Sequence, residues 1–180
     1  QLSEDKLSIT GRNGMSVAFT KEESAETASE THLPDRPISS HPNLVTENGL
    51  YLLREQLELA KCAYEAAQQT EDVNERRRLS ALPLRDMRYF AERLRTAQPI
   101  SNPNSVDKVA FGATVTFQRA DARVQKFQIV GEDEADPKAG SISFVSPIAA
   151  SLMGKSVGDV IGSGDREIEV IEISISSPRT

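Results

Sequence analysis

Apolar positions follow helical spacing in two separate stretches between residues 46 and 97. Over 46–69 they recur at alternating steps of three and four, as in a coiled-coil seam, at Leu50, Leu53, Leu57, Ala60, Tyr64 and Ala67. The hydroxyl of Thr46 is predicted to cap this first helix. Over 73–97 the stripe comprises Leu84, Met87, Phe90 or Ala91, and Leu94. Two helices of nearly equal length around a short polar break predict an antiparallel hairpin over 45–98.

Pro83 interrupts the second helical stretch. A proline inside a helix removes one hydrogen bond and bends the axis, so we expect a kink there. The alternative is a shorter helix that Ser80 caps, with Pro83 in its first turn and a longer loop at the tip. Either hairpin buries one stripe per helix, and we therefore expect it to lean on a neighbouring domain.

Beyond residue 106 the pattern changes to short runs rich in β-branched and aromatic residues, which indicate strands. The predicted strands are 109–117, 124–130, 142–145, 157–161 and 167–175. Ser146 and Pro147 are predicted to begin a short helix that ends at Gly154. The fold class is therefore α+β, with the helical hairpin followed by a small antiparallel β domain over 106–176.

The two remaining segments lack either periodicity. Residues 1–44 are predicted to form a disordered arm, in which three prolines within nine residues favour extended backbone. Met15 resembles a natural start, so residues 1–14 are either a leader or an upstream extension. Alternatively, 33–39 is a docking peptide that becomes ordered on a partner. The proline-rich stretch 99–105 is predicted to be a linker.

Charge and composition narrow the possible partners. Of 180 residues, 27 are acidic and 21 are Lys or Arg, which gives a net charge of −6 and argues against a broad basic face for nucleic acid. No apolar run approaches the ~20 residues that span a bilayer. The single cysteine, Cys62, and the two histidines have no zinc-like spacing, so we expect no metal in the isolated protein and a cytoplasmic location. The acidic run 132–136 is interpreted as a solvated turn, because its spacing does not fit a calcium loop.

Six short blocks of the C-terminal half follow one another in a specific order and spacing. They are Gly112-x2-Val115; Ile129-Val130-Gly131-x2-Glu134-Ala135-Asp136; Gly140-x-Ile142-Ser143; Ser146-Pro147-Ile148-Ala149; Leu152-Met153-Gly154-Lys155; and Val157-Gly158-Asp159. In these blocks the chain resembles the C-terminal domain of the bacterial Gre-type transcript cleavage factors. The hairpin resembles the N-terminal coiled coil of that family at Thr46-x2-Gly49-x3-Leu53-x3-Leu57 and Arg93-Leu94-x2-Ala97. The likeness covers about residues 45–175.

The resemblance implies a protein in two parts. Residues 106–176 would have an FKBP-like fold and dock on the rim of the RNA polymerase secondary channel, with Val145, Ser146, Pro147 and Ile148 at the contact. The coiled coil would enter the channel and present acidic tip residues that help to hold a second Mg²⁺ of the polymerase, which then cleaves backtracked RNA. The chain would be an accessory factor and not an enzyme. We expect a monomer without a cofactor of its own and without independent sequence-specific nucleic-acid binding.

At the predicted tip, Asp72 and Glu75 keep the Asp-x-x-Glu spacing of the family. Arg76, Arg77 and Arg78 follow where the family has neutral residues, and each arm is about two turns, or roughly 10 Å, shorter. A carboxylate that falls short by that distance cannot coordinate a metal at ~2.1 Å, and the arginines compete for its charge. We therefore expect Asp72 and Glu75 to cap the second helix and the chain to regulate elongation. Metal handling by this pair, and hence stimulated cleavage, is the alternative.

Other interpretations remain open at this stage. The arginines of the second helix form either a solvated face or a contact with an acidic or phosphate-rich surface of the channel; they are Arg76, Arg77, Arg78, Arg85, Arg88, Arg93 and Arg95. A prolyl isomerase would need an apolar, aromatic-lined pocket, whereas Phe111, Phe117, Phe127 and Phe144 are spaced as core residues of strands. A third possibility is a coiled-coil adaptor for another protein.

Overall fold

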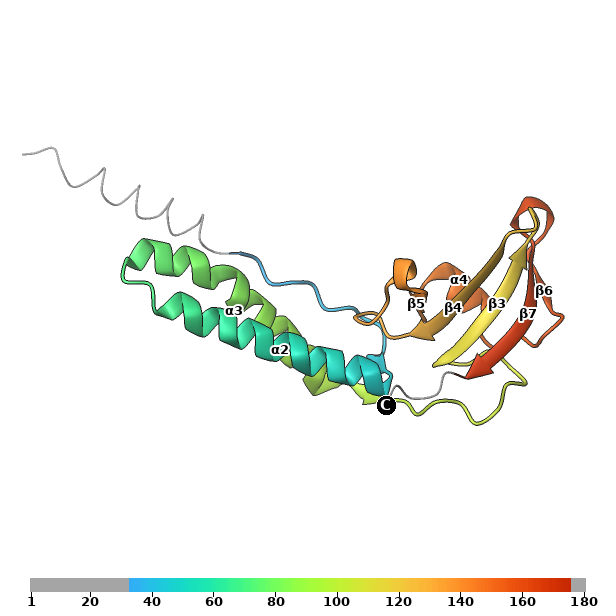
Figure 1. Cartoon of the computed structure of the whole chain (residues 1–180), viewed down its shortest axis with the longest axis horizontal. Helices are drawn as coiled ribbons and strands as arrows, with labels where there is room; N and C mark the ends of the chain where they lie inside the picture. Colours follow the sequence, from blue (N-terminus) through green and yellow to red (C-terminus); the bar gives the residue numbers. More distant parts are fainter. Residues whose placement is uncertain (1–32, 176–180) are drawn as a thin grey trace, which may run out of the picture. The chain divides into compact units, whose positions relative to one another are not determined.

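The computed structural model describes residues 33–175 as a helical hairpin and a sheet domain (Figure 1). The hairpin consists of β1 (Leu44–Val45), α2 (Glu47–Gln68), α3 (Val73–Thr96) and β2 (Gln98–Pro99). The sheet domain consists of β3 (Ala113–Arg119), β4 (Val124–Val130), η1 (Pro137–Ala139), β5 (Ser141–Ser143), α4 (Pro147–Leu152), β6 (Val160–Ile161), η2 (Gly164–Arg166) and β7 (Ile168–Ile175). The predictions for 1–32 lie outside the described residues.

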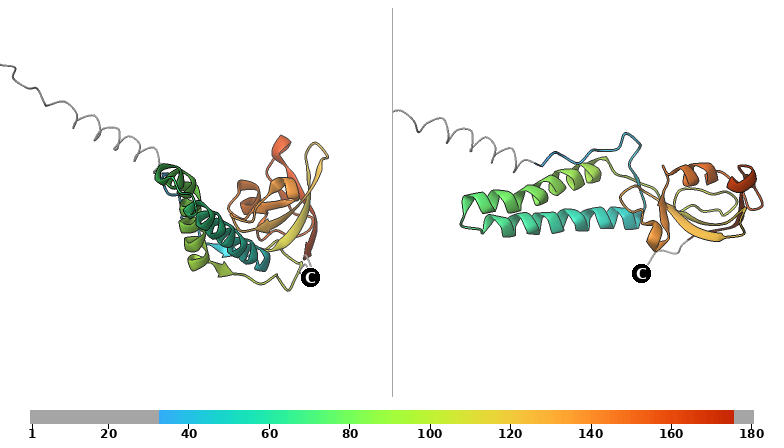
Figure 2. Two further views of the ribbon diagram at one scale, coloured as in Figure 1. Left: turned by 60° about the vertical axis from the view of Figure 1, so that its left-hand side comes forward. Right: turned by 90° about the horizontal axis from the view of Figure 1, so that it is seen from above.

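The hairpin forms as the apolar spacing predicts, and α2 and α3 lie side by side in both views of Figure 2. The hydroxyl of Thr46 accepts a hydrogen bond from the Gly49 N–H at 2.9 Å, which caps α2. Leu53, Ala60 and Ala67 are buried at intervals of seven residues. Their spacing keeps one narrow stripe of α2 against α3, and the two alanines allow the helices to approach closely.

Helix α3 runs through Pro83 as one helix over Val73–Thr96. The alternative of a shorter helix that starts at Ser80 is therefore wrong. Ser80 is instead buried inside α3, and its hydroxyl accepts a hydrogen bond from Gln68 Nε2 at 2.8 Å. The bond joins the last turn of α2 to α3 and satisfies a polar group in the helix interface.

The sheet has the strand order β5-β4-β3-β7-β6. Strand β5 pairs in parallel with β4, whereas the pairs β3–β4, β3–β7 and β6–β7 are antiparallel. The prediction of an antiparallel domain was therefore wrong for one edge. A strand of three residues carries too little alternation to indicate the direction of its pairing. The FKBP-like likeness stays a prediction.

The core of the sheet domain lies between one face of the sheet and α4. Its buried residues are Val109, Ala113, Val115, Phe117, Ile129, Ile142, Ala149, Leu152, Ile168, Val170 and Ile173. The register of β3 with β7 shifts between Thr116, opposite Glu172, and Phe117, opposite Val170. The shift leaves Ile171 unpaired and 41% exposed, which explains the imperfect alternation of β7.

Residues 34–43, which we call the strap, follow the hairpin and are ordered. The prediction of a disordered arm over 1–44 is therefore wrong for the strap, and also for Leu44, which lies in β1. Asn43, at the end of the strap, is buried and donates hydrogen bonds from Nδ2 to the Arg93 carbonyl at 2.6 Å and to Thr96 Oγ1 at 3.1 Å. The side chain of Asn43 thereby holds the strap against the last turn of α3.

Two short strands close the base of the hairpin. β1 pairs in parallel with β2, with Leu44 opposite Gln98 and Val45 opposite Pro99. Pro99 offers no N–H, and the bonds on either side of it run from the Gln98 N–H to the Asn43 carbonyl and from the Ile100 N–H to the Val45 carbonyl. The pairing ties the start of α2 to the end of α3, and it takes the first residue of the predicted linker 99–105 into a strand.

Candidate functional site

The tip carboxylates are engaged in local contacts of α3. Asp72 is the N-cap, and its Oδ1 accepts a hydrogen bond from the Glu75 N–H at 2.7 Å. Glu75 does not complete a capping box, because its two oxygens accept from Arg78, at 2.6 Å from Nη2 and at 3.0 Å from Nε. The hydrogen bond from Arg78 lowers the pKa of Glu75 below its ordinary value.

The three arginines after Glu75 have separate surroundings. Arg76 donates from Nη1 to the Thr70 carbonyl at 3.1 Å and so closes the turn between the helices. Arg78 pairs with Glu75, and the side chain of Arg77 is exposed. Of the three predicted channel contacts, Arg77 is therefore the one whose guanidinium faces solvent without a local bond among the described residues.

The tip does not fit a magnesium site in this arrangement. Mg²⁺ prefers several oxygen ligands in near-octahedral geometry. Both oxygens of Glu75 and one oxygen of Asp72 are already occupied by N–H donors, and a cationic guanidinium lies against Glu75. Within residues 33–175, no group of three or more His, Cys, Asp or Glu side chains is placed to hold a metal ion.

The predicted docking turn lies between β5 and α4. Ser146 caps α4, since its hydroxyl accepts from the Ala149 N–H at 3.3 Å, and its own N–H donates to the Ser143 carbonyl at 2.9 Å. Pro147 occupies the first turn of α4, where its missing N–H costs nothing, and its ring is exposed. Val145 is half-buried, and Ile148 packs against the core. The geometry thus makes Pro147 the projecting residue and Ile148 chiefly a structural one.

An ion-pair cluster joins α3 to the loop after β4. Arg93, whose side chain is 2% exposed, donates from Nε to Asp133 Oδ2 at 2.5 Å. The Tyr89 hydroxyl donates to the other oxygen, Asp133 Oδ1, at 2.6 Å, and Glu132 Oε2 lies 3.8 Å from Arg93 Nη2. Burial of the ring, and then its bond to Asp133, raises the pKa of Tyr89 to about 12. We call Tyr89, Arg93, Glu132 and Asp133 the junction cluster.

A second contact of the same loop reaches the start of α2. Glu134 accepts from Thr46 Oγ1 at 2.5 Å and from Asn48 Nδ2 at 2.8 Å, which places its charge at the positive end of the helix. A Cβ at Gly49 would lie 2.6 Å from Glu134 Oε2, so a side chain there would displace the carboxylate. A Cβ at Gly131 would collide with the backbone carbonyl of Leu44, which excludes a larger residue there.

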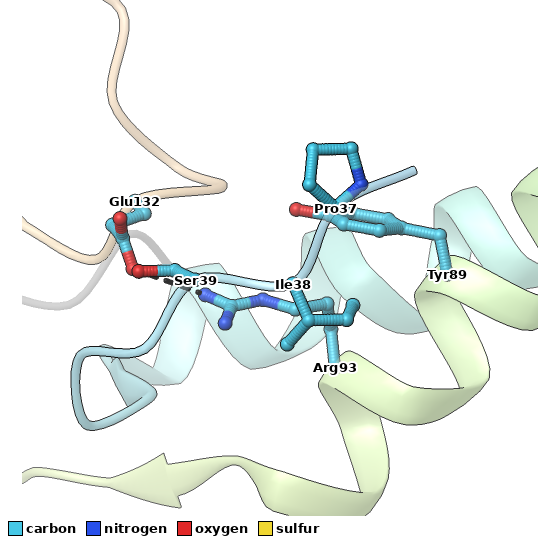
Figure 3. A pocket seen from close by; sticks show the side chains of 6 residues that line it. All are labelled: Pro37, Ile38, Ser39, Tyr89, Arg93 and Glu132. Carbon is cyan, nitrogen blue, oxygen red and sulfur yellow. Dashed lines mark ion pairs between the residues drawn. The ribbon is translucent and has the colours of Figure 1, made fainter. Parts of the chain in front are cut away.

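A shallow cleft of about 300 Å³ adjoins the junction cluster (Figure 3). Its lining comes from the strap, from α3 and from the loop after β4, namely Pro37, Ile38, Ser39, Tyr89, Arg93 and Glu132. The side chains of Arg93 and Glu132 point toward each other across its floor. Three segments far apart in the sequence therefore meet at one place.

The interpretation of 132–136 as a solvated turn was wrong for Asp133 and Glu134, and Arg93 belongs to no solvated face. The sequence carried one signal of this cluster, namely a charged residue at helical spacing from an aromatic one. Arg93 is four residues after Tyr89, which puts both side chains on one face of α3.

The four phenylalanines of the sheet domain fill or cover its core, so they do not line the open pocket that a prolyl isomerase would need.

These features describe a two-part factor: a helical hairpin with a charged tip, and a mixed-sheet domain that holds the hairpin at its base. The C-terminal part matches the family model "Transcription elongation factor, GreA/GreB, C-term" over residues 103–175. "Transcription elongation factor GreA" of Methylobacterium nodulans is 38% identical over 118 residues, covering 63% of this chain and 70% of that protein. The protein of the same name from Mesorhizobium japonicum is 40% identical over 115 residues, covering 61% of this chain and 68% of that protein. The chain belongs to the GreA/GreB family of transcription elongation factors.

Similar solved structures include the GreA factor homolog 1 (Gfh1) of Thermus thermophilus, with a TM-score of 0.34 and 21% identity over 72% of this chain and 97% of that one. The GreA/GreB factor from Nitrosomonas europaea has a TM-score of 0.35 and 20% identity, covering 73% of this chain and 98% of that one. In the described part of the chain, none of the helices is long and apolar enough to cross a membrane.

Proposed function

We propose that this chain is a transcription elongation regulator that binds RNA polymerase at its secondary channel and modulates paused or backtracked complexes. The sheet domain docks on the channel rim through the turn 145–148, and the hairpin occupies the channel. The protein acts as a monomeric accessory factor in the cytoplasm and not as an enzyme. It does not by itself bind nucleic acid in a sequence-specific manner. Membership of the elongation factor family supports the partner and the process.

The engagement of the tip carboxylates is the observation that carries the regulatory assignment. Asp72 caps α3 and Glu75 is held by Arg78, so both perform local structural roles. Occupying a channel requires shape, which a hairpin with helices of 22 and 24 residues provides. Holding a metal would require the two side chains to exchange N–H donors for Mg²⁺, at the cost of a cap and an ion pair.

Stimulated transcript cleavage is the second candidate. Asp72 and Glu75 are both near the exposed turn of the hairpin and three residues apart, so they lie close together on the first turn of α3. Contacts inside the polymerase that draw Arg78 away would free the carboxylate of Glu75. The two functions share one docking mode and differ in whether the pair is needed.

Docking is tested by the affinity of the full-length chain for core RNA polymerase. Replacing Ser146 and Pro147 together with Ala is expected to weaken binding at least about tenfold, since several contacts at a rim of this kind contribute about 1 kcal/mol each. Asp159→Ala is a matched control, because it removes a comparable side-chain bond to a backbone N–H, at 2.8 Å from Ser156, in another exposed turn. Unchanged affinity of a folded Ser146/Pro147 variant would remove this turn from the proposal.

A further inference from the structure

The strap adds a contact to the junction cluster from outside the hairpin and the sheet domain. Arg36 lies over the ring of Tyr89, with Cζ 3.7 Å from the ring centroid, and its Nη1 is 3.5 Å from Asp86 Oδ1. Asp35 pairs with Arg88 at 2.7 Å on the same helix. About one turn of α3, from Asp86 to Tyr89, is thus contacted by two neighbouring residues of the strap.

Tyr89 transmits this contact to the sheet domain. One face of its ring carries the Arg36 guanidinium, and its hydroxyl donates to Asp133, which also holds Arg93. A guanidinium stacked on an aromatic ring restrains the ring through cation–π attraction and flat contact. The restrained ring keeps its hydroxyl aimed at the loop after β4. The next part of the strap lines the same cleft as Glu132 (Figure 3), with Pro37, Ile38 and Ser39 in its wall.

We propose that Arg36 is a positioning residue: through Tyr89 and Asp133 it fixes the angle between hairpin and sheet domain, and hence the place of the tip. The strap then restrains the contact between the hairpin and the sheet domain, and it is needed for the protein's function. The effect of Arg36 on RNA polymerase rests on the proposed function, whereas its effect on the angle between the hairpin and the sheet domain does not.

The angle between the hairpin and the sheet domain matters because the tip lies far from the junction. About 21 residues of α3 separate Arg93 from the cap at Asp72, a length of roughly 30 Å at 1.5 Å per residue. A rotation of 10° at the junction therefore displaces the tip by roughly 5 Å. A displacement of this size exceeds the length of a hydrogen bond, about 3 Å, so a specific contact between the tip and the channel would be lost.

The direct test measures the distance between the two parts in the free protein. Nitroxide labels are attached to two cysteines, and double electron–electron resonance spectroscopy measures the distance between them. The first is Cys62, which is exposed on α2, and the second is introduced by Ala120→Cys in the exposed turn after β3. The labelled protein is expected to give one narrow distance distribution. Arg36→Ala is expected to at least double its width, because Tyr89 loses the guanidinium over its ring.

Two further variants separate positioning from general stability. Arg36→Lys keeps the charge but not the planar stack, and is expected to broaden the distribution less than Arg36→Ala. Arg77→Ala removes an exposed arginine of α3 near the tip and is expected to leave the distribution unchanged. Far-ultraviolet circular dichroism should be the same for all three variants, since Arg36 lies outside both helices and Arg77 is an exposed position of α3 at which alanine favours the helix.

The polymerase gives the second readout. Arg36→Ala is expected to bind core polymerase within about twofold of the parent chain but to lose about tenfold in its effect on paused complexes. A distribution that stays narrow in Arg36→Ala, or that is already broad in the parent, would overturn the proposal. Failure of the parent chain to bind polymerase would refute the proposed function while the distance measurement still decides the role of Arg36.

Discussion

Asp133→Ala tests the junction cluster most severely, because Asp133 accepts from both Arg93 and Tyr89. The side chains of Arg93 and Asp133 are 2% and 14% exposed, so the pair is almost fully removed from water. Removing one partner of a buried pair typically costs about 3–5 kcal/mol. Glu132, at 3.8 Å from Arg93, compensates in part. We therefore expect a loss of about 3 kcal/mol in the free energy of unfolding.

The matched control is Asp121→Ala. Asp121 also accepts from an arginine Nε, that of Arg123 at 2.6 Å, but these side chains are 51% and 72% exposed. An exposed pair contributes much less than a buried one, because both charges keep their contact with water. Urea unfolding followed by circular dichroism gives both values, and equal losses for Asp133→Ala and Asp121→Ala would refute the account of the junction. Adding Arg93→Met to Asp133→Ala should recover part of the stability, because the buried guanidinium that lost Asp133 is then removed, although Glu132 loses its partner.

Three further predictions concern single side chains. The pKa of Tyr89, about 12, should appear in the difference between the ultraviolet titrations of the parent and of Tyr89→Phe. Because this folded-state pKa lies above the unfolded value of about 10, the contribution of Tyr89 to stability is complete below about pH 10 and falls as the pH rises through about 12; partial exposure limits the loss to roughly 1 kcal/mol. Leu53→Ala should cost about 3 kcal/mol in urea unfolding, because Leu53 is 2% exposed, whereas Leu57→Ala, at a half-buried position, should cost about half as much. Arg78→Ala should raise the depressed carboxyl pKa of Glu75 in an NMR titration; in the parent chain the stabilising contribution of this pair is present above the unfolded pKa of Glu75 and is lost as the pH falls through the folded value.

Local patterns predicted those parts of the structure whose contacts are close in the sequence. The predicted hairpin seam is confirmed in part, since Leu53, Ala60 and Ala67 are buried whereas Leu50, Leu57 and Tyr64 are half-buried. The cap at Asp72 followed from its position three residues before Glu75. Both are properties of a single helix or of two adjoining helices. Such features follow from periodicity and capping chemistry alone.

The junction could not be predicted in the same way. Arg93 and Asp133 are 40 residues apart, and Arg36 and Asp86 are 50 apart. An acidic run such as 132–134 has the composition of a solvated turn until the fold brings a buried guanidinium to it. The parallel edge strand β5 was missed for a related reason, because its three residues carry no directional signal. In each case tertiary contact decided what local sequence left undetermined.

RNA cleavage in a stalled, backtracked transcription complex tests the central claim most directly. The parent chain and the Asp72→Ala/Glu75→Ala variant would be added to complexes with core RNA polymerase at saturating concentration, with binding confirmed in the same samples. The account predicts that both proteins bind and alter elongation to a similar extent and that neither accelerates cleavage of the transcript. Rapid cleavage with the parent chain, abolished in the double variant while binding persists, would contradict the account and assign the tip carboxylates to metal-assisted cleavage.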